Sequence, residues 1–499
     1  MTRILIPSGA LGLGYDPEAL ARGVANGPDL IAIDGGSTDS GPSYLGRGVS
    51  KYSRSGTKAE WKGLIEARAE AGCPLIIGTA GTCGTDSMVD WLVEITRECL
   101  RELGQTARIA TLRCQQPPTR VAKALADGRL RPLGNAPDIS DTLIGACENI
   151  VALAGAEQVL AAINTGADII IAGRTTDTAI ISALPIARGD HAGGAWHGAK
   201  IGECGALCAT NPQSGVIEIE FDATGFRVTP LADGAHCTPH TVSAHMLYEN
   251  SDPFILYEPG GHLDVTGATY RSIDDRSVLV EGSVWVPSED YTVKLEGARI
   301  AGYQTILLAT VRDRHYVRNI SRWCDDILDK HAKKMVARLG GDVAATVTCE
   351  LRMMGLNATL GALETREDHP PEVGVLGILT APTQALANEA GKLLNPYLLH
   401  HPLTREEEQP TFAFPFSPAE IDRGAAYEFC LNHVMVLGGA FAVTLQLLEQ
   451  VNTQASPYGR RLAVPSRRNR FVILRAVSSP PVALHPASRR RSYSQLHVA

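Results

Sequence analysis

Five short apolar runs alternate with amphipathic stretches over the first 190 residues, and this alternation limits the fold more than any other feature. The runs are RILIPSG, DLIAIDGG, PLIIGTAG, RIATLRC and DIIIAGRT. Such runs are typical of strands buried on both faces. Between them, residues 59–72 and 88–103 carry apolar side chains at helical spacing, and residues 139–166 read as helix with a break near Gly155. Repeated strand and helix predict right-handed βαβ units and a parallel sheet.

The pattern changes after about residue 200. A hairpin is predicted over residues 215–230, and residues 264–286 continue with β-branched alternation and Gly/Asp turns. Further elements are predicted at four ranges: helices over 324–340 and 383–401, strands over 344–355 and 372–381. We therefore predict an α/β protein with an N-terminal parallel-sheet domain over 1–195 and a mixed α+β domain over 196–440.

The last 49 residues, 451–499, differ from the rest in charge. They contain nine arginines and no acidic residue, so the net charge of −8 leaves −17 on the remainder. A remainder this acidic gives no electrostatic reason to bind nucleic acid. We predict that the Arg/Ser/Pro-rich tail is a disordered appendage, with a basic interaction arm and a misread gene end as alternatives.

The chain shows no sign of a membrane or secretory route. No apolar run approaches the roughly 18–20 residues that span a bilayer, and the start MTRILIPSGALGLGYD lacks the basic and apolar regions of a signal peptide. The eleven cysteines are scattered and odd in number, as expected for reduced thiols. We expect a cytoplasmic protein without a membrane partner.

Three of the predicted strands end in similar polar loops, 34–41, 78–87 and 173–178, and each loop contains a Thr-Asp pair. Ligands of open parallel sheets bind outside the carboxyl ends of the strands, so three such loops predict one shared crevice. The residues that we expect to bind substrate there are Asp34, Gly35, Ser37, Thr38, Tyr44, Thr82, Arg174 and Asp177. The residues that we expect to be catalytic are Asp39, Asp86, Glu203 and His262.

Each of these assignments has a structural alternative. Thr and Asp directly before a helix are favoured N-caps, which applies most to Asp86 and Asp177. Arg174 can clamp a substrate carboxylate or phosphate with its planar fork, or it can pair with Asp177 or another local acid. Glu203 lies beside Cys204 and can serve as a general base, while buried cysteines are more often core residues.

The segment YEPGGHLDVTG places Glu258, His262 and Asp264 on a Gly-rich turn. The aspartate can orient the histidine as a general base, or both can be plain turn residues. Cys204 and Cys208 with the histidines of HCTPHTVSAH fit no standard zinc spacing, so we predict no metal site. The glycines of PSGALGLG are out of register for GxGxxG and no Walker lysine follows, so we predict no redox cofactor.

The segments DGGSTDSGPSYLG, GTAGTCGTDSMVDWL, IAGRTTDTA and FSPAEIDRGAAYEFCLNHV resemble the acyclic terpene utilisation AtuA-like family over residues 2–434. The resemblance implies a cytosolic protein of branched terpenoid-acid catabolism through CoA thioesters. Related chains often carry or accompany a small second domain after the NHV segment, and this sequence departs from that pattern after His433. The resemblance supplies no catalytic residues.

Three functions remain open on the sequence alone. The first is a hydratase/dehydratase- or isomerase-like enzyme that acts on a branched or polycarboxylic acid or its acyl-CoA thioester. Arg174 and loop amides would hold the anionic group, and Asp39 or Asp86 would move a proton. The second is a non-catalytic subunit or ligand-binding protein of an acyl-CoA-processing complex, with a small partner subunit or a second copy of itself. The third is a tailoring enzyme of secondary metabolism.

Overall fold

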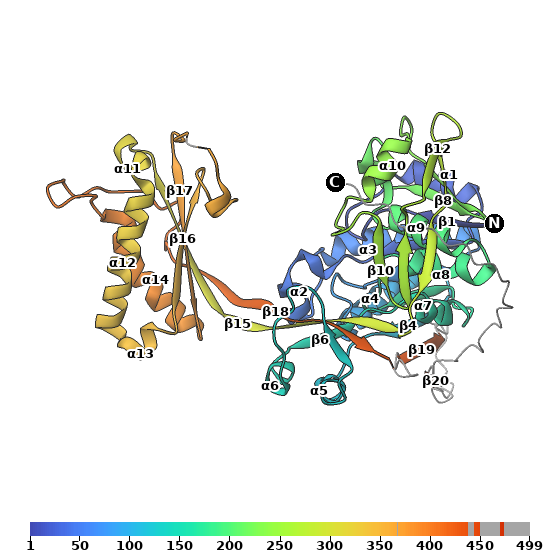
Figure 1. Cartoon of the computed structure of the whole chain (residues 1–499), viewed down its shortest axis with the longest axis horizontal. Helices are drawn as coiled ribbons and strands as arrows, with labels where there is room; N and C mark the ends of the chain where they lie inside the picture. The colour runs from blue at the N-terminus through green and yellow to red at the C-terminus, as the bar shows by residue number, and fades with distance from the viewer. Residues whose placement is uncertain (367, 438–443, 450–469, 474–499) are drawn as a thin grey trace, which may run out of the picture.

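The computed structural model describes residues 1–366, 368–437, 444–449 and 470–473, so most of the predicted tail lies outside the described residues. Two long strands, β15 (Thr292–Val311) and β18 (Ile421–Val436), join the two parts that Figure 1 shows. We call residues 303–425 the distal lobe and the other described residues the body. No helix among the described residues is both long and apolar enough to cross a membrane.

Five parallel strands form the centre of the body, and each is one of the predicted apolar runs. Neighbouring strands pair parallel throughout. In sheet order they are β1 (Thr2–Ile6), β2 (Leu30–Asp34), β3 (Leu75–Gly78), β7 (Ile169–Ala172) and β4 (Arg108–Arg113). The predicted parallel α/β sheet is therefore confirmed.

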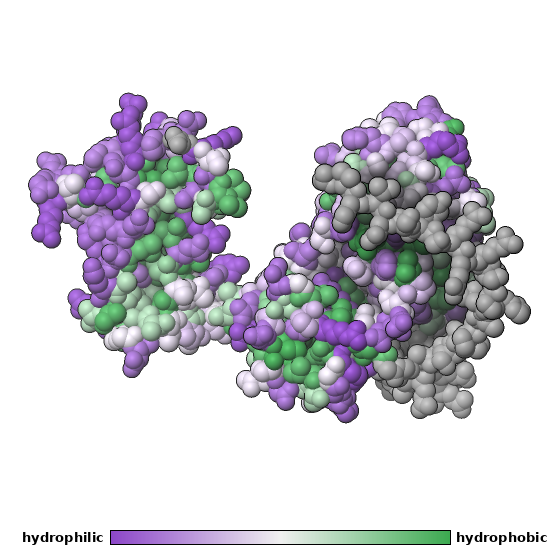
Figure 2. Space-filling model, viewed as in Figure 1, coloured by the Kyte–Doolittle hydropathy of each residue, from purple (hydrophilic) through white to green (hydrophobic). Residues whose placement is uncertain are grey.

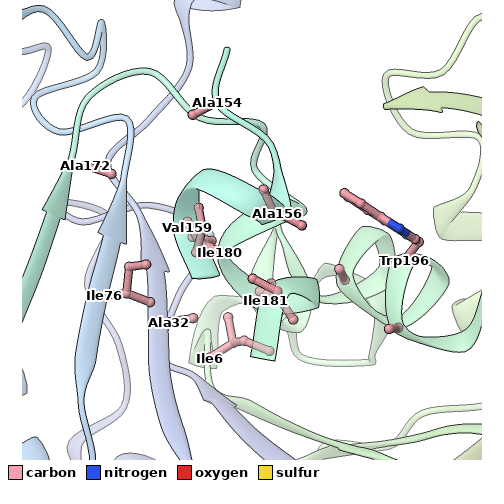
Figure 3. Packing of buried hydrophobic residues seen from close by; sticks show 14 of the residues in the cluster. Ile6, Ala32, Ile76, Ala154, Ala156, Val159, Ala172, Ile180, Ile181 and Trp196 are labelled. Atoms are coloured by element: carbon pink, nitrogen blue, oxygen red, sulfur yellow. The ribbon is translucent and has the colours of Figure 1, made fainter. Parts of the chain in front are cut away.

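Helices cover both faces of this sheet because successive strand side chains point to opposite faces. One face packs against α1 (Pro17–Ala25), α3 (Arg54–Ala71) and α4 (Asp86–Leu103). The other packs against α7 (Ala156–Ile163), α8 (Ala179–Arg188) and α9 (Ala192–Gly202). Figure 3 shows this second layer, in which Ile76 and Ala32 of the strands lie opposite Ile180 and Ile181 of α8. Burial on both faces explains why the strands are almost wholly apolar.

Antiparallel strands extend the sheet on both sides to eleven strands. On the side of β1 these strands are β8 (Ile217–Phe221), β9 (Gly225–Pro230), β13 (Val278–Glu281) and β12 (Thr269–Ser272). On the side of β4 they are β19 (Thr444–Glu449) and β20 (Arg470–Ile473). The predicted hairpin over 215–230 is confirmed as β8 and β9. The sheet runs across the predicted division at residue 195, and that division stays a prediction.

The helix predicted over 139–166 is wrong in its middle. The segment forms α6 (Asp141–Gly145), then strand β6 (Asn149–Ala152), then α7. β6 pairs antiparallel with the first half of β15, and Ile150, Val151 and Ala152 are buried. A short apolar run gives no reliable period, so strand pairing with a distant segment decided its conformation.

The distal lobe is an antiparallel sheet with helices packed against it. Its strands are β16 (Thr348–Met354), β17 (Val373–Ala381) and the distal halves of β15 and β18. Its helices are α11 (Arg314–Arg318), α12 (Ile320–Leu339), α13 (Gly341–Ala344) and α14 (Gln384–His400). The helices and strands predicted between residues 324 and 401 are confirmed.

Shorter elements connect these layers. A three-stranded sheet on the body consists of β10 (Ile255–Glu258), β11 (Gly261–Asp264) and β14 (Val284–Pro287). The remaining elements of the body are η1 (Thr38–Ser40), α2 (Pro42–Arg47), α5 (Pro118–Ala126), β5 (Leu130–Pro132), η2 (Gly205–Cys208), η3 (Pro212–Ser214) and α10 (Pro239–His245). The distal lobe also contains η4 (Gly361–Leu363).

Candidate functional site

The loops that follow β2, β3 and β7 meet at the carboxyl edge of the parallel sheet. The backbone N–H of Thr82 donates to the carbonyl of Gly35 at 2.9 Å, and the N–H of Arg174 donates to the carbonyl of Gly84 at 3.1 Å. The structure thus brings together the three loops that the sequence places at one edge. The loop after β2 contributes Ser37, Thr38 and Asp39 to the lining of a pocket at this edge, so it is more than a plain connection.

Close backbone contact at this edge depends on glycine. A Cβ at Gly84 would lie 2.3 Å from the backbone nitrogen of Arg174, and one at Gly35 would lie 2.4 Å from the carbonyl oxygen of Thr79. The loop after β3 also holds Thr79 and Thr82 at φ values of 46° and 73°, which β-branched residues rarely adopt. Strained backbone of this kind persists where the surroundings enforce it and is common at functional sites.

Arg174 is buried at the centre of the edge and is bonded on several sides. Its Nε lies 3.1 Å from Oε2 of Glu296 on β15, and its Nη1 lies 3.3 Å from Oδ1 of Asp177. Nη1 also donates to the hydroxyl of Thr79 at 3.1 Å. Of the two sequence interpretations, these contacts favour the local ion pairs. The Nη2 side, with Thr38 Oγ1 at 3.4 Å, is the least engaged part of the guanidinium.

A pocket of about 360 Å³ opens beside Arg174. Its charged lining is Asp39, Arg174, Lys294 and Glu296, and Asn135, Phe429 and Leu431 complete much of the wall. Nζ of Lys294 lies 3.0 Å from Oε1 of Glu296, and the lysine is partly exposed. We call this cavity the edge pocket. It contains two cationic and two acidic side chains, and the cationic pair offers a place for an anionic group.

Four carboxyl groups gather at the same edge, and we call Asp34, Asp177, Glu203 and Glu258 the carboxyl cluster. Asp34 and Glu203 are buried, and Asp177 and Glu258 are half-buried. Asp34, Glu203 and Glu258 each interact electrostatically with Asp177. Nζ of Lys200, near the end of α9, donates a buried hydrogen bond to Oε1 of Glu203. Oε1 of Glu258 accepts a 2.6 Å hydrogen bond from the Thr178 hydroxyl. Oδ1 of Asp34 and Oε2 of Glu258 are buried and make no hydrogen bond with the described residues.

Burial governs the protonation of the carboxyl cluster, because a buried carboxylate loses its hydration. Burial raises the pKa of Glu258 to about 7, and hydrogen bonds from threonine oppose this shift only in part. Burial likewise raises the pKa of Glu203 to about 8, against the opposing effect of Lys200. The pKa values of Asp34 and Asp177 are also raised by burial, with Arg174 acting in the opposite direction. The cluster can therefore hold protons near neutral pH.

Glu296 shows the opposite behaviour at the same edge. Its burial favours the neutral form, but Arg174, Lys294 and the Thr38 hydroxyl outweigh that effect and lower its pKa to about 2. The Thr38 hydroxyl donates to Oε2 of Glu296 at 2.6 Å. The site thus combines one permanently ionised carboxylate with four carboxyl groups that hold protons more tightly. Such separation of pKa values marks candidate acid and base groups.

Asp39 lies at the rim, exposed on η1 and beside the edge pocket. The carboxyl of Glu249 lies within hydrogen-bonding reach of Asp39, and burial together with this acidic neighbour raises the pKa of Glu249. Ser37, which lines the pocket, accepts a hydrogen bond from the backbone N–H of Asp39 at 3.4 Å and caps η1. These three residues form the outer boundary of the site.

The other sequence-predicted residues lie in separate surroundings. Asp86 is the first residue of α4, where its carboxylate approaches Arg113 at 3.9 Å, so it acts in the helix start and not in the cluster. Tyr44 packs against the buried group of Leu45 and Cys83. His262 lies on β11, where its ring contacts that of Tyr257 at a centroid distance of 5.6 Å. The structure therefore does not place Asp86 or His262 in the carboxyl cluster.

Sequence reasoning did not select Lys200, Glu258, Lys294 or Glu296 as site residues. The sequence feature that could have indicated such site residues is a charged residue within an otherwise apolar stretch. Lys200 and Glu203 lie three residues apart at the end of α9, in which residues 193–202 are all buried. Glu296 lies in β15 between buried neighbours. Among the described residues, no group of three or more His, Cys, Asp or Glu side chains is arranged to hold a metal ion.

The fold and the site define an α/β protein with a cluster of four carboxyl groups of raised pKa at the carboxyl edge of a parallel sheet. The family model described as "Acyclic terpene utilisation family protein AtuA" matches residues 52–404, and the chain belongs to this family. The match contains the loops at 78–87 and 173–178, while the loop at 34–41 lies outside it. Membership links the chain to acyclic terpene utilisation. No curated protein and no solved structure matches the chain.

Proposed function

We propose that the protein is a cytoplasmic proton-transfer enzyme, a hydro-lyase or isomerase that acts on a branched or polycarboxylic acid or its acyl-CoA thioester. The carboxyl cluster is the observation that carries this proposal. Proton transfer is most efficient when the pKa of the acid or base lies near the working pH. Glu258 and Glu203, with pKa values raised by burial to about 7 and about 8, meet this condition.

The reaction needs two proton-transfer groups and a support for developing charge. In dehydration, a base takes a proton from the carbon next to the carbonyl, the C–O bond breaks, and an acid protonates the departing hydroxyl to give water. Glu258 in its ionised form serves as the base, and Glu203 in its protonated form serves as the acid. Addition of water runs through the same steps in reverse. Neither direction transfers electrons to a cofactor.

In this proposal, other residues of the edge bind the substrate and orient the proton-transfer groups. Lys294 and the Nη2 side of Arg174 face the edge pocket and fit an anionic group of the substrate. The Thr178 hydroxyl fixes the orientation of Glu258 through its 2.6 Å hydrogen bond. Burial raises the pKa of Asp34, and in its protonated form this carboxyl can donate a hydrogen bond to a carbonyl oxygen on which negative charge develops.

The test is turnover by the purified full chain in D₂O with a panel of branched acids and their CoA thioesters, both saturated hydroxy forms and α,β-unsaturated forms. The readouts are deuterium incorporation next to the carbonyl and the change in conjugated-enoyl absorbance. We expect Glu258→Gln and Glu203→Gln to lower turnover by about 10²- to 10⁴-fold. Glu218→Gln is the matched control, because Glu218 is a buried carboxyl with a raised pKa on β8. Absence of exchange with every substrate, or equal losses in all three variants, would contradict the proposal.

A ligand-binding subunit of an acyl-CoA-processing complex is the second candidate. The distal lobe favours it, because Val336, Val343 and Met354 expose 53%, 40% and 42% of their surface there. Exposed apolar groups that gather on one part of a protein mark interaction surfaces. Thermal stabilisation by a member of the panel without any turnover would support this candidate over the enzyme.

A further inference from the structure

Strand β16 is an open edge of the distal-lobe sheet. It stands first in the order β16-β17-β15-β18-β5 and, among the described residues, pairs only with β17. An edge strand presents a row of backbone N–H and C=O groups to a further strand. Natural proteins block such edges with proline, lysine or a bulge. The sequence TCELRMM of β16 contains neither proline nor lysine, and its register with β17 is continuous.

The side chains of β16 are self-complementary in charge. Glu350 and Arg352 lie two residues apart on one face, and their side chains are 56% and 49% exposed. In antiparallel pairing of two identical strands about Leu351, Glu350 of each copy stands opposite Arg352 of the other. The same register places Thr348 opposite Met354 and leaves no like charges facing each other. Opposite charges directly across a strand pair stabilise it.

An apolar groove borders the same edge on the helix side. Its volume is about 480 Å³, and its lining comes from α12, α13 and the start of β16. The main apolar residues of this lining are Leu328, Met335, Val336, Ala344, Val347 and Cys349. Figure 2 shows hydrophobic residues over the distal-lobe sheet, where Figure 1 places β16 and β17. The open strand and the groove therefore form one continuous surface.

We propose that two copies of the chain associate through this surface, with β16 paired to β16 about a two-fold axis at Leu351. The two-fold axis brings the helices beside each groove across to the other copy, so that each covers the apolar residues of its partner. The symmetry of Glu350 and Arg352 about Leu351 favours a second copy as the occupant, because the two side chains that pair within one strand at 2.8 Å can exchange partners across the axis. Closed two-fold association of this kind is the commonest form of oligomer.

The test is the association state of the full chain, measured by analytical ultracentrifugation over a wide range of concentration. We expect a dimer for the natural sequence. Glu350→Arg and Arg352→Glu each place like charges opposite each other twice, so each raises the dimer dissociation constant by about tenfold or more. The double variant Glu350→Arg/Arg352→Glu exchanges the charges and restores the dimer. Circular dichroism checks that the exposed substitutions leave the fold intact.

Val336→Glu tests the groove separately, and we expect it to weaken the dimer without a change at β16. A monomer at every concentration would overturn the proposal, as would a dimer that neither single charge reversal weakens. A pair of single reversals that weaken association but fail to restore it in combination would also overturn the register. These outcomes do not depend on turnover, so they are independent of the proposed enzymatic function.

Discussion

The body and the distal lobe differ in whether they bury Asp, Glu, Lys and Arg side chains. Among the described residues, the buried Asp, Glu, Lys and Arg side chains all lie in the body: Asp34, Arg174, Lys200, Glu203, Glu218 and Glu296. The Lys and Arg ion pairs of the distal lobe, such as Arg352 with Glu350 and Arg312 with Glu372, lie at the surface. Both parts bury an apolar core against a sheet.

This difference distinguishes residues that stabilise the fold from residues that can take part in a reaction. Burial of a charge costs several kcal/mol unless a partner compensates it, so a fold gains little from placing charges inside. The body nevertheless gathers five of its buried charged groups at one sheet edge, where strained backbone and a pocket also occur. Among its described residues, the distal lobe buries no Asp, Glu, Lys or Arg side chain and holds no residue other than glycine at positive φ, and it presents an open strand beside an apolar groove. We infer that the body performs the reaction and that the distal lobe serves association.

The largest effect on stability is expected at the centre of the body site. Arg174→Ala removes the buried one of the two cationic partners of Glu296 and leaves the carboxylate buried, which should lower the free energy of unfolding by about 3–5 kcal/mol. Urea denaturation followed by circular dichroism measures the change. Arg174→Ala/Glu296→Gln should recover part of the loss, because the double variant no longer buries the Glu296 carboxylate. An equal loss in single and double variants would show that packing, and not charge, is the cause.

The next effect is a pH dependence from the carboxyl cluster. The folded pKa of Glu203 is about 8 and the unfolded value about 4.5, so the folded state binds the proton more tightly. Its contribution to stability is fully present below about pH 4.5 and is lost as pH rises towards 8. The unfolding free energy of the natural chain should fall relative to Glu203→Gln across this window, by about 2–4 kcal/mol.

Glu258 and Glu296 contribute to stability with opposite dependences on pH. The corresponding window for Glu258 ends near pH 7, because its folded pKa is about 7. Glu296 has a folded pKa of about 2, so it contributes stability above about pH 4.5 and loses it as pH falls to 2. Denaturation at a series of pH values measures all three. Parallel curves for the natural chain and Glu203→Gln would contradict the assigned shift.

A smaller effect should follow from crowding the loops of the edge. Gly84 has φ +63°, and a Cβ there would meet the Arg174 backbone, so Gly84→Ala should destabilise the protein by about 1–3 kcal/mol. Gly341 at the start of α13 has open space around it, and Gly341→Ala should change stability by at most about 1 kcal/mol, in the favourable direction. Thermal denaturation compares the two. Equal effects would contradict the tight packing of the edge loops.

The smallest effect is expected for a surface ion pair of the distal lobe. Arg312 lies 3.9 Å from Glu372, and both side chains are mostly exposed. Arg312→Ala should lower the unfolding free energy by no more than about 1 kcal/mol, because solvent screens such pairs. The same urea denaturation measures it. A loss as large as that of Arg174→Ala would remove the contrast between the two parts.

The sequence allowed the parallel sheet to be predicted because its strands are continuous apolar runs followed by helices. It also allowed Asp34, Thr38, Arg174 and Asp177 to be placed at one edge, since loops at the carboxyl ends of parallel strands share that edge. Strand β6 was missed because its four residues pair with β15, far along the chain. Pairing between distant segments leaves no local period in the sequence.

Part of the site escaped prediction for a related reason. Glu296 reaches Arg174 from a strand 122 positions further along the chain, and Glu258 reaches Thr178 across 80 positions. Asp86 and His262 were selected for their local context, which fits a helix start and a turn as well as it fits catalysis. Only the three-dimensional structure shows whether such a residue lies in the site or in a helix start or turn elsewhere.

The most direct test of the central claim is the titration of Glu203 and Glu258 by ¹³C NMR of protein labelled at the glutamate side-chain carboxyl. Glu203→Gln and Glu258→Gln assign the two signals by their disappearance. We predict that both carboxyl groups titrate near neutral pH, at about 8 and about 7. Titration of both below pH 5 would mean that the cluster is ionised under working conditions, and it would contradict the proton-transfer role.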